Sequence, residues 1–200
     1  MKEYLIKIVN LIKSIFLRIV KLVHLPLEEW VHITQDYQNV SSVRKNFFFP
    51  CIMLVLSLTF INALFKWSDL VFSDFLRDTL VRFSSLFAGV YFSVLLLNEV
   101  LRIKWVAGEA SDKDNFYGCF TLTVFSSSIM WCMDMIQMFI PPFFFLAVLN
   151  IYVAYVIWCG LPILFRQLGD NHKGLLTLIA FALMFLIPRA VGYVMLRIIE

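Results

Sequence analysis

The sequence predicts an all-α integral membrane protein in which five transmembrane helices follow an amphipathic helix at the membrane surface. Of its 200 residues, 61% are hydrophobic and 16% are charged, and mean hydropathy is +0.84. Its apolar runs have about twenty residues or more, enough for a helix to cross a hydrocarbon layer of about 30 Å. No run shows the wide polar face of a soluble helix, and 21 phenylalanines exceed what a soluble domain of this size carries.

Residues 1–24 form the predicted amphipathic helix. Polar residues recur every third or fourth position on one face, and apolar residues cover the rest. A basic helix of this kind lies at the headgroups, where its cations meet anionic lipid. Basic residues in every turn and the lack of a small-residue cleavage site argue against a signal peptide. A helix packed on the protein's own cytoplasmic face stays open as an alternative. The cations expected at the membrane surface are Lys7, Lys13, Arg18 and Lys21.

Pro26 ends this helix, because proline cannot continue the helical hydrogen bonds. Residues 25–36 then form a short second element. Residues 36–46 are polar and contain serine, which predicts a linker. We therefore divide the chain into a cytoplasmic or interfacial segment, 1–46, and a transmembrane domain, 47–200.

Five apolar runs make up the transmembrane domain. Only Pro141-Pro142 separates the third run from the fourth, and this pair predicts a tight helical hairpin. Hydrophilic loops are expected between the other runs. The predicted spans are about 47–65, 80–101, 116–140, 143–165 and 174–198.

Lysine and arginine counts predict the orientation, because cytoplasmic segments carry the excess of these residues. With the amino terminus inside, twelve of the 17 fall in inner segments and five in the outer half. We therefore expect a cytoplasmic amino terminus and an outside carboxyl terminus. The lack of a second targeting signal favours a bacterial inner membrane. The five outer residues are Lys66, Arg77, Arg82, Arg189 and Arg197.

Two charged residues, Asp134 and Arg189, lie inside the third and fifth spans. Both spans run outward, and both residues fall in the outer half at similar depth. Burying either charge alone would cost several kcal/mol. We therefore predict an ion pair between them, with Gln137 and Asn150 close by. This polar cluster either fixes helix packing or lines a cavity, and the sequence leaves both interpretations open.

A stripe of small residues runs along the second span. Ser85, Gly89 and Ser93 recur every fourth residue and so share one face. Small side chains let the backbones of two membrane helices come close together. We interpret this stripe as a helix-packing face.

The sequence shows no motif that indicates catalysis, a cofactor or a metal. Its three histidines lie in hydrophilic parts, and its net charge of +3 does not indicate nucleic-acid binding. The four cysteines form no CxxC pair, so we interpret them as small apolar residues. We predict no enzymatic activity, no catalytic residue and no cofactor. The cysteines are Cys51, Cys119, Cys132 and Cys159.

Two stretches of the chain resemble a known family. Leu25–Ile33 reads Leu-Pro-Leu-Glu-Glu-Trp-Val-His-Ile and precedes a polar linker and a span that opens at Phe49-Pro50. Asn150–Gly160 precedes a short polar turn and a last span with Pro188. Together they resemble the bacterial branch of the Yip family, the Ypt/Rab-interacting membrane proteins. The resemblance implies five spans and a cytoplasmic amino terminus. Asn115–Phe120 differs from the Asp-Leu-Tyr-Gly-Pro motif of the eukaryotic relatives, so the resemblance does not imply Rab binding.

These observations predict a non-enzymatic Yip-like membrane protein that acts as a scaffold or assembly factor through helix–helix and membrane-surface contacts. Its expected partners are membrane lipids and either a membrane protein or a second copy of the chain. The alternative is a small transporter or channel subunit with a polar cavity around Asp134 and Arg189. A lipid-modifying enzyme would need an acid, base or metal site at the interface, and the sequence offers only the isolated His24 and His32.

Overall fold

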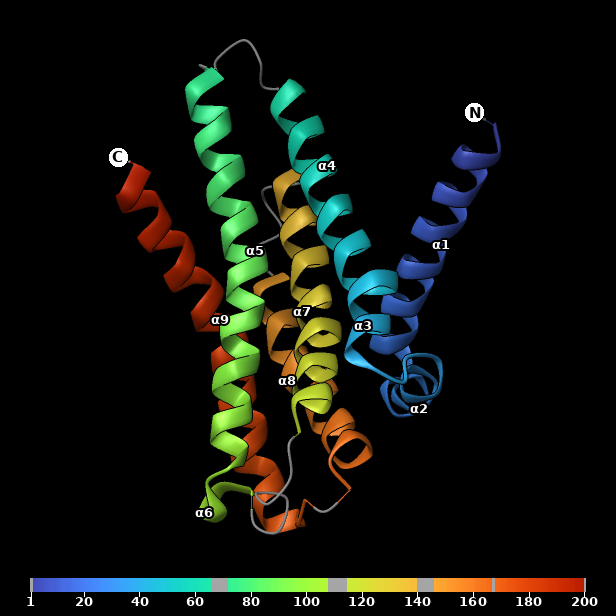
Figure 1. Cartoon of the computed structure of the whole chain (residues 1–200), viewed down its shortest axis with the longest axis vertical. Helices are drawn as coiled ribbons and strands as arrows, with labels where there is room; N and C mark the ends of the chain where they lie inside the picture. Colours follow the sequence, from blue (N-terminus) through green and yellow to red (C-terminus); the bar gives the residue numbers. More distant parts are fainter. Residues whose placement is uncertain (1, 66–71, 108–114, 140–145, 167, 200) are drawn as a thin grey trace.

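The computed structural model describes residues 2–65, 72–107, 115–139, 146–166 and 168–199. Throughout these ranges the chain is helical between short turns, and none of them contains a strand. Figure 1 shows long helices side by side, with α2 and α6 toward one end of the bundle. The elements are α1 (Lys2–His24), α2 (Pro26–Asp36), α3 (Val40–Val43), η1 (Arg44–Phe48), α4 (Phe49–Phe65), α5 (Phe72–Leu101), α6 (Lys104–Ala107), α7 (Phe116–Phe139), α8 (Leu146–Leu164) and α9 (Asp170–Ile199).

Helix α7 forms the centre of the bundle. Of its most apolar 18-residue window, 83% is buried, against 22% for α9. It packs against α5, α8 and α4. A helix that is apolar all round is suited to such a position, because every face meets another helix. The core of the protein therefore lies along α7, and α9 has most of its surface open to the surroundings.

Four helical segments are long and apolar enough to cross a membrane: Val40–Asn62, Phe75–Leu101, Phe116–Phe139 and Asp170–Ile199. A shorter apolar segment, Asn150–Leu164, belongs to α8. The chain is thus an all-helical protein with several apolar helices of membrane-spanning length.

Three helical segments begin earlier than the sequence predicted, including α9, which starts at Asp170 rather than near residue 174. Helical structure starts at Val40, inside the expected linker, because the Asn39 side chain accepts a hydrogen bond of 2.8 Å from the Ser42 amide and caps the first turn. Helix α5 starts at Phe72, inside the expected loop. Polar residues can occupy the first turns of a helix, so the apolar boundary does not mark where helical structure begins. The predicted turn at Pro141-Pro142 lies outside the described residues.

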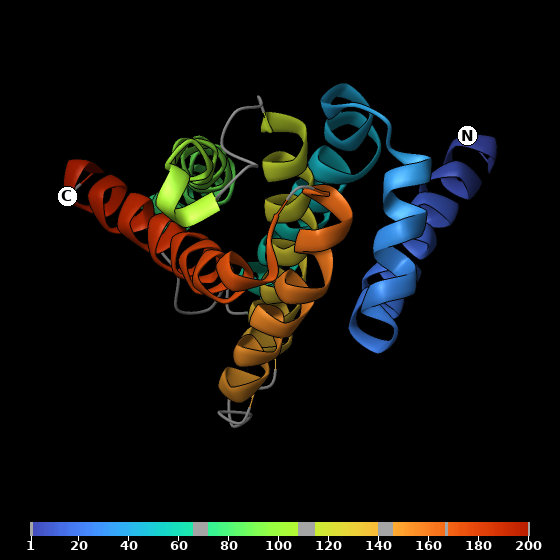
Figure 2. The same cartoon turned by 90° about the horizontal axis from the view of Figure 1, so that it is seen from below.

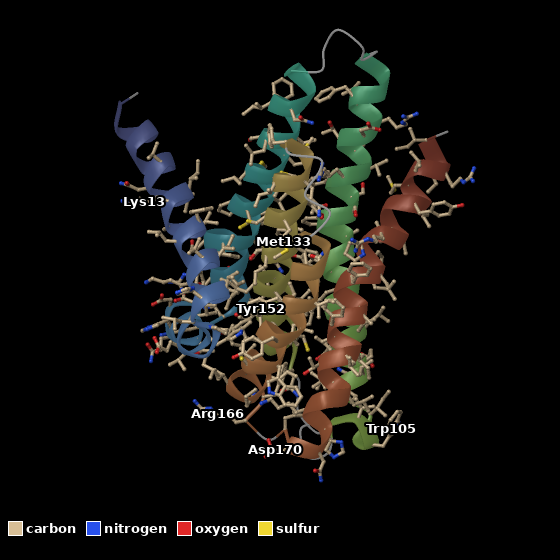
Figure 3. The ribbon with its side chains drawn as sticks, turned by 180° about the vertical axis from the view of Figure 1, so that it is seen from behind. Lys13, Trp105, Met133, Tyr152, Arg166 and Asp170 are labelled. Carbon is tan, nitrogen blue, oxygen red and sulfur yellow. The ribbon has the colours of Figure 1, made fainter. Side chains whose placement is uncertain are left out.

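Helices α5 and α9 have 30 residues each and form the most extensive helix pair. Figures 1 and 3 show α9 changing direction partway along its length. Pro188 lies inside α9 and has no amide hydrogen for the helical ladder, which is a common cause of such a bend.

Helices α1 and α2 lie on the side of the bundle away from the carboxyl terminus (Figure 2). Helix α1 runs opposite to α4 and leans away from it toward the amino terminus (Figure 1). The buried residues of α1, Ile15, Ile19 and Leu22, face the bundle, whereas Lys13 and Lys21 are exposed. The carboxyl-terminal half of α1 therefore makes the protein contacts of this helix.

Candidate functional site

Trp30 anchors the amino-terminal part of the chain to the bundle. We call residues 15–37 the platform. The Trp30 side chain is fully buried, and its indole N–H donates a hydrogen bond of 2.9 Å to the carbonyl of Val156 on α8. Its ring meets Phe125 of α7 edge-on, at 6.1 Å between centroids. Because a buried indole needs an acceptor, this one bond fixes both the position and the orientation of α2.

Gly160 makes room for that tryptophan. A Cβ atom at this position of α8 would lie 2.6 Å from Cε2 and 2.8 Å from Nε1 of Trp30. It would also lie 3.0 Å from the Leu122 side chain on α7. Only glycine therefore allows the indole to lie against the backbone of α8.

Two tyrosine hydroxyls hold the ends of the platform helices. Tyr152 of α8 donates a hydrogen bond of 2.6 Å to the Val23 carbonyl, and Tyr117 of α7 donates one to the Tyr37 carbonyl. Carbonyls at helix ends lack partners within their own helix, so these bonds satisfy groups that would otherwise need water. Burial raises the pKa of Tyr37, and the positive charge of Arg18 partly offsets this effect.

Arg18 joins α1 to α2. Its Nη2 lies 2.5 Å from Oδ2 of Asp36, and its Nε lies 3.5 Å from Oε1 of Glu29. The guanidinium also lies over the Tyr37 ring, at 5.2 Å from the centroid. The sequence assigned Arg18 to the membrane surface, whereas the structure turns it toward α2. Of the other cations assigned to that surface, Lys13 and Lys21 are exposed, and the side chain of Lys7 lies outside the described ones.

The outer face of α2 is exposed and partly apolar. Leu27 and Val31 lie one turn apart and are 55% and 42% exposed. The exposed side chains of Glu28 and His32 flank them. The opposite face carries the buried residues of α2, so the platform presents this exposed face in one fixed orientation.

The small-residue stripe of α5 lies against α9. Ser85 Oγ donates a hydrogen bond of 2.5 Å to the Pro188 carbonyl, and Ser93 Oγ lies 3.2 Å from the Leu183 carbonyl. A Cβ atom at Gly89 would lie 2.7 Å from the Pro188 Cα. The two backbones thus approach so closely that no larger side chain fits between them.

The predicted ion pair between Asp134 and Arg189 is not formed. In the part of the chain that the structure describes, no arginine lies within salt-bridge distance of Asp134. Arg189 Nη1 instead donates a hydrogen bond of 2.7 Å to the Phe185 carbonyl, and its guanidinium lies 3.5 Å from the centroid of the Phe185 ring. An acceptor four residues back on the same helix is within easy reach, which explains why Arg189 turns there.

A second arginine, Arg82 of α5, lies near Asp134, and the sequence interpretation did not place it there. Its Nη1 lies 3.6 Å from the Met138 sulfur, one turn after Asp134 on α7. The charges of Arg82 and Arg189 both act on the Asp134 carboxylate. The position of Arg82 three residues before Ser85, on the helix of the stripe, could have indicated this. Gln137 and Asn150 are both half-buried.

Two apolar grooves open on the surface of the described helices. One, of about 830 Å³, lies between α5 and α9 and includes Phe83, Ala88 and Ala190. The other, of about 570 Å³, lies between α1, α4 and α7 and includes Ile15 and Trp131. Neither is lined by Asp134 or Arg189, so these grooves offer apolar contact surfaces rather than a polar cavity.

Helices of this length and hydropathy, held together by interhelical hydrogen bonds, define a polytopic α-helical membrane protein. The chain belongs to the Yip1 domain family, because the family model, described as the Yip1 domain, matches residues 22–189. This finding confirms the resemblance to the Yip family. No curated protein and no solved structure matches the chain. The matched region contains both Trp30 and Gly160, which come from the two stretches that carry the resemblance.

Proposed function

We propose that this Yip1 domain protein is a non-enzymatic scaffold or assembly factor of the bacterial inner membrane. In this proposal the shorter helix α8 also crosses the membrane, as the fourth of five spans, the amino terminus lies in the cytoplasm and the carboxyl terminus lies outside. Membrane lipids and either a membrane protein or a second copy of the chain are its partners.

The observation that carries this proposal is the fixed presentation of α2. Its inner face is held by Trp30 and by the Arg18 ion pairs, and its outer face leaves Leu27 and Val31 exposed. A short apolar pair on a rigid element can bind a partner at a reduced ordering cost. The groove between α5 and α9 offers a second contact surface, at the level of the lipid, for another helix.

The residues at the α2 end of the bundle support the proposed orientation. Figure 3 shows Trp105, Arg166 and Asp170 toward this end. Trp105 is 70% exposed, as expected for an aromatic residue at a membrane interface. Arg102 and Arg166 are also exposed and add positive charge, which favours the cytoplasmic side.

Helix α1 needs headgroups or water along its polar face. Beside α4, the exposed Lys13 on this face points away from the bundle (Figure 3). A lysine at the centre of a bilayer costs about 3 kcal/mol. We therefore propose that in a bilayer α1 tilts from α4 toward the cytoplasmic surface. Lys13→Cys should then react with a membrane-impermeant thiol reagent added from the cytoplasmic side only, and labelling from the outside would contradict the proposed topology.

Site-specific crosslinking tests the scaffold function. A photoreactive residue at Leu27 or Val31 should give one discrete adduct in native membranes, whereas Ile151, 67% exposed on α8, serves as the control position. Val31→Asp should abolish the adduct from Leu27 and leave the Tm unchanged. A chain that stays monomeric and gives no position-dependent adduct would refute the proposal.

A transporter or channel subunit is the second candidate, and the half-buried Asp134 near Arg82 and Arg189 favours it. The double exchange Asp134→Arg with Arg189→Asp separates the two functions. If the exchange restores the stability that each single change removes, the charges are structural. If the exchanged protein folds but loses proton or chloride flux that the parent shows in proteoliposomes, transport is supported.

A further inference from the structure

Three charged side chains from three helices come together toward the end of α7. Arg82 of α5 contacts Met138, which lies one turn beyond Asp134 on α7. Ser85, one turn after Arg82, bonds the carbonyl of Pro188, the residue before Arg189. These two contacts bring α5 against both α7 and α9, so the three charges lie in one region of the membrane-spanning helices.

The charges in this region do not balance. Two guanidiniums accompany one carboxylate, and across the described residues neither arginine pairs directly with Asp134. One unit of positive charge is left over. An uncompensated charge at the depth of a span is unfavourable, so such a charge is normally paired.

Most N–H donors of the two guanidiniums have no hydrogen-bond partner among the described residues. Each carries five N–H groups. The hydrogen-bond contact of Arg82 within the described region is the Met138 sulfur, a weak acceptor, and that of Arg189 is the Phe185 carbonyl. Arg189 is exposed and lies ten residues before the end of α9, which is roughly 15 Å along the helix. Among the described residues, no carboxylate lies within salt-bridge distance of either guanidinium.

We propose that Arg82 and Arg189 bind a single phosphate group between α5, α7 and α9. Guanidinium forks bind phosphate oxygens in pairs, through charge-assisted hydrogen bonds. The phosphate comes either from a phospholipid of the outer leaflet or from free inorganic phosphate. The negative charge of Asp134 offsets one of the two positive charges, so the remaining charge matches a single anion.

Thermal unfolding in an uncharged detergent tests this site. The Tm of the purified full chain is measured against inorganic phosphate, with chloride at equal ionic strength as the reference. It is measured separately against phosphatidylglycerol, with diacylglycerol as the reference. A rise with phosphate identifies the free ion, and a rise with phosphatidylglycerol but not with diacylglycerol identifies the lipid. Either result supports the proposal, and no rise with either ligand overturns it.

Arg189→Gln should raise the half-saturating concentration of the phosphate ligand at least tenfold, because the amide removes the positive charge. Arg197→Gln is the matched control, since Arg197 lies over Tyr193 four residues earlier, as Arg189 lies over Phe185. Equal effects of the two changes would show a general charge effect and would overturn the proposal.

Asp134→Asn separates an anion site from a structural charge cluster. Removing the carboxylate takes away a repelling charge, so this variant should bind the phosphate group several-fold more tightly. A folded Asp134→Asn protein that binds less tightly than the parent would contradict the charge excess on which the site depends.

Discussion

The platform and the small-residue stripe of α5 each form a packing interface, here called a seam, and the two seams hold this bundle together by different means. At the platform, a buried indole lies over Gly160 and its N–H has a single acceptor. At the stripe, two backbones meet directly at Gly89 and Pro188. The platform joins a partly polar segment to the bundle, so aromatic burial and directed hydrogen bonds decide its position. The stripe joins two lipid-exposed helices, for which lipid supplies no hydrophobic driving force and close packing is needed instead.

Removing the indole should have the largest effect. Trp30→Ala deletes a fully buried aromatic side chain, and such changes cost about 3–5 kcal/mol. We expect a clear fall in Tm in detergent. Trp105→Ala, at a position that is 70% exposed, should leave the Tm nearly unchanged. Similar shifts for both variants would show that Trp30 is not the anchor of the platform.

Adding a side chain at either glycine should have the next largest effect. Gly89→Val and Gly160→Val overfill tight contacts, which typically costs about 1–3 kcal/mol. Ala88→Val, one residue along and in the lipid-facing groove, is the control and should be tolerated. Tm values in one detergent provide the measurement.

A double-mutant cycle sharpens the difference between the two seams. Gly160→Ala meets the Trp30 side chain, so its cost should largely disappear in a Trp30→Leu background. Gly89→Ala meets the Pro188 Cα, and no side-chain change at Pro188 removes that atom. Additive costs at the first pair would contradict the proposed contact.

Breaking the Arg18 ion pairs should have a moderate effect. Arg18→Gln leaves the Glu29 carboxylate, whose side chain is 5% exposed, without its cation, at a cost of about 1–3 kcal/mol. Lys21→Gln, on the exposed face of the same helix, is the matched control. Limited proteolysis within residues 2–24 should accelerate for the first variant and not for the second.

The smallest effect is expected at the stripe hydroxyl. Ser85→Ala removes the bond to the Pro188 carbonyl and keeps the small size, and interhelical hydrogen bonds in membranes average about 0.6 kcal/mol. If Ser85→Ala destabilises the protein more than Gly89→Val, hydrogen bonding rather than close approach holds this seam.

The local pattern of apolar residues predicted the helices. Contacts between residues far apart in the sequence could not be predicted from that pattern. Apolar runs indicate the helices because their length is set by the thickness of lipid. The spacing of Ser85, Gly89 and Ser93 indicates a shared face from periodicity alone. No such rule links Trp30 to Val156, since 126 residues separate them and only the packed bundle makes the indole fit at Gly160.

The charge cluster shows the same limit. Matching depth along two helices placed Asp134 and Arg189 at similar heights. It could not predict the direction in which each side chain turns. The Arg189 side chain donates a hydrogen bond to the carbonyl four residues before it on α9. Arg82 lies on a third helix, α5, which a comparison of depths does not identify. The early start at Val40 has a comparable cause, because one capping side chain at Asn39 decided it.

The separation of Trp30 from its acceptor has a consequence for biosynthesis. The ribosome makes α2 long before it makes α8, so the tryptophan emerges when neither Val156 nor Gly160 yet exists. Until the last third of the chain has entered the bilayer, the nascent amino-terminal segment must wait undocked at the headgroups, where an indole is well tolerated. Docking of this segment is therefore a late step that must follow the insertion of α8.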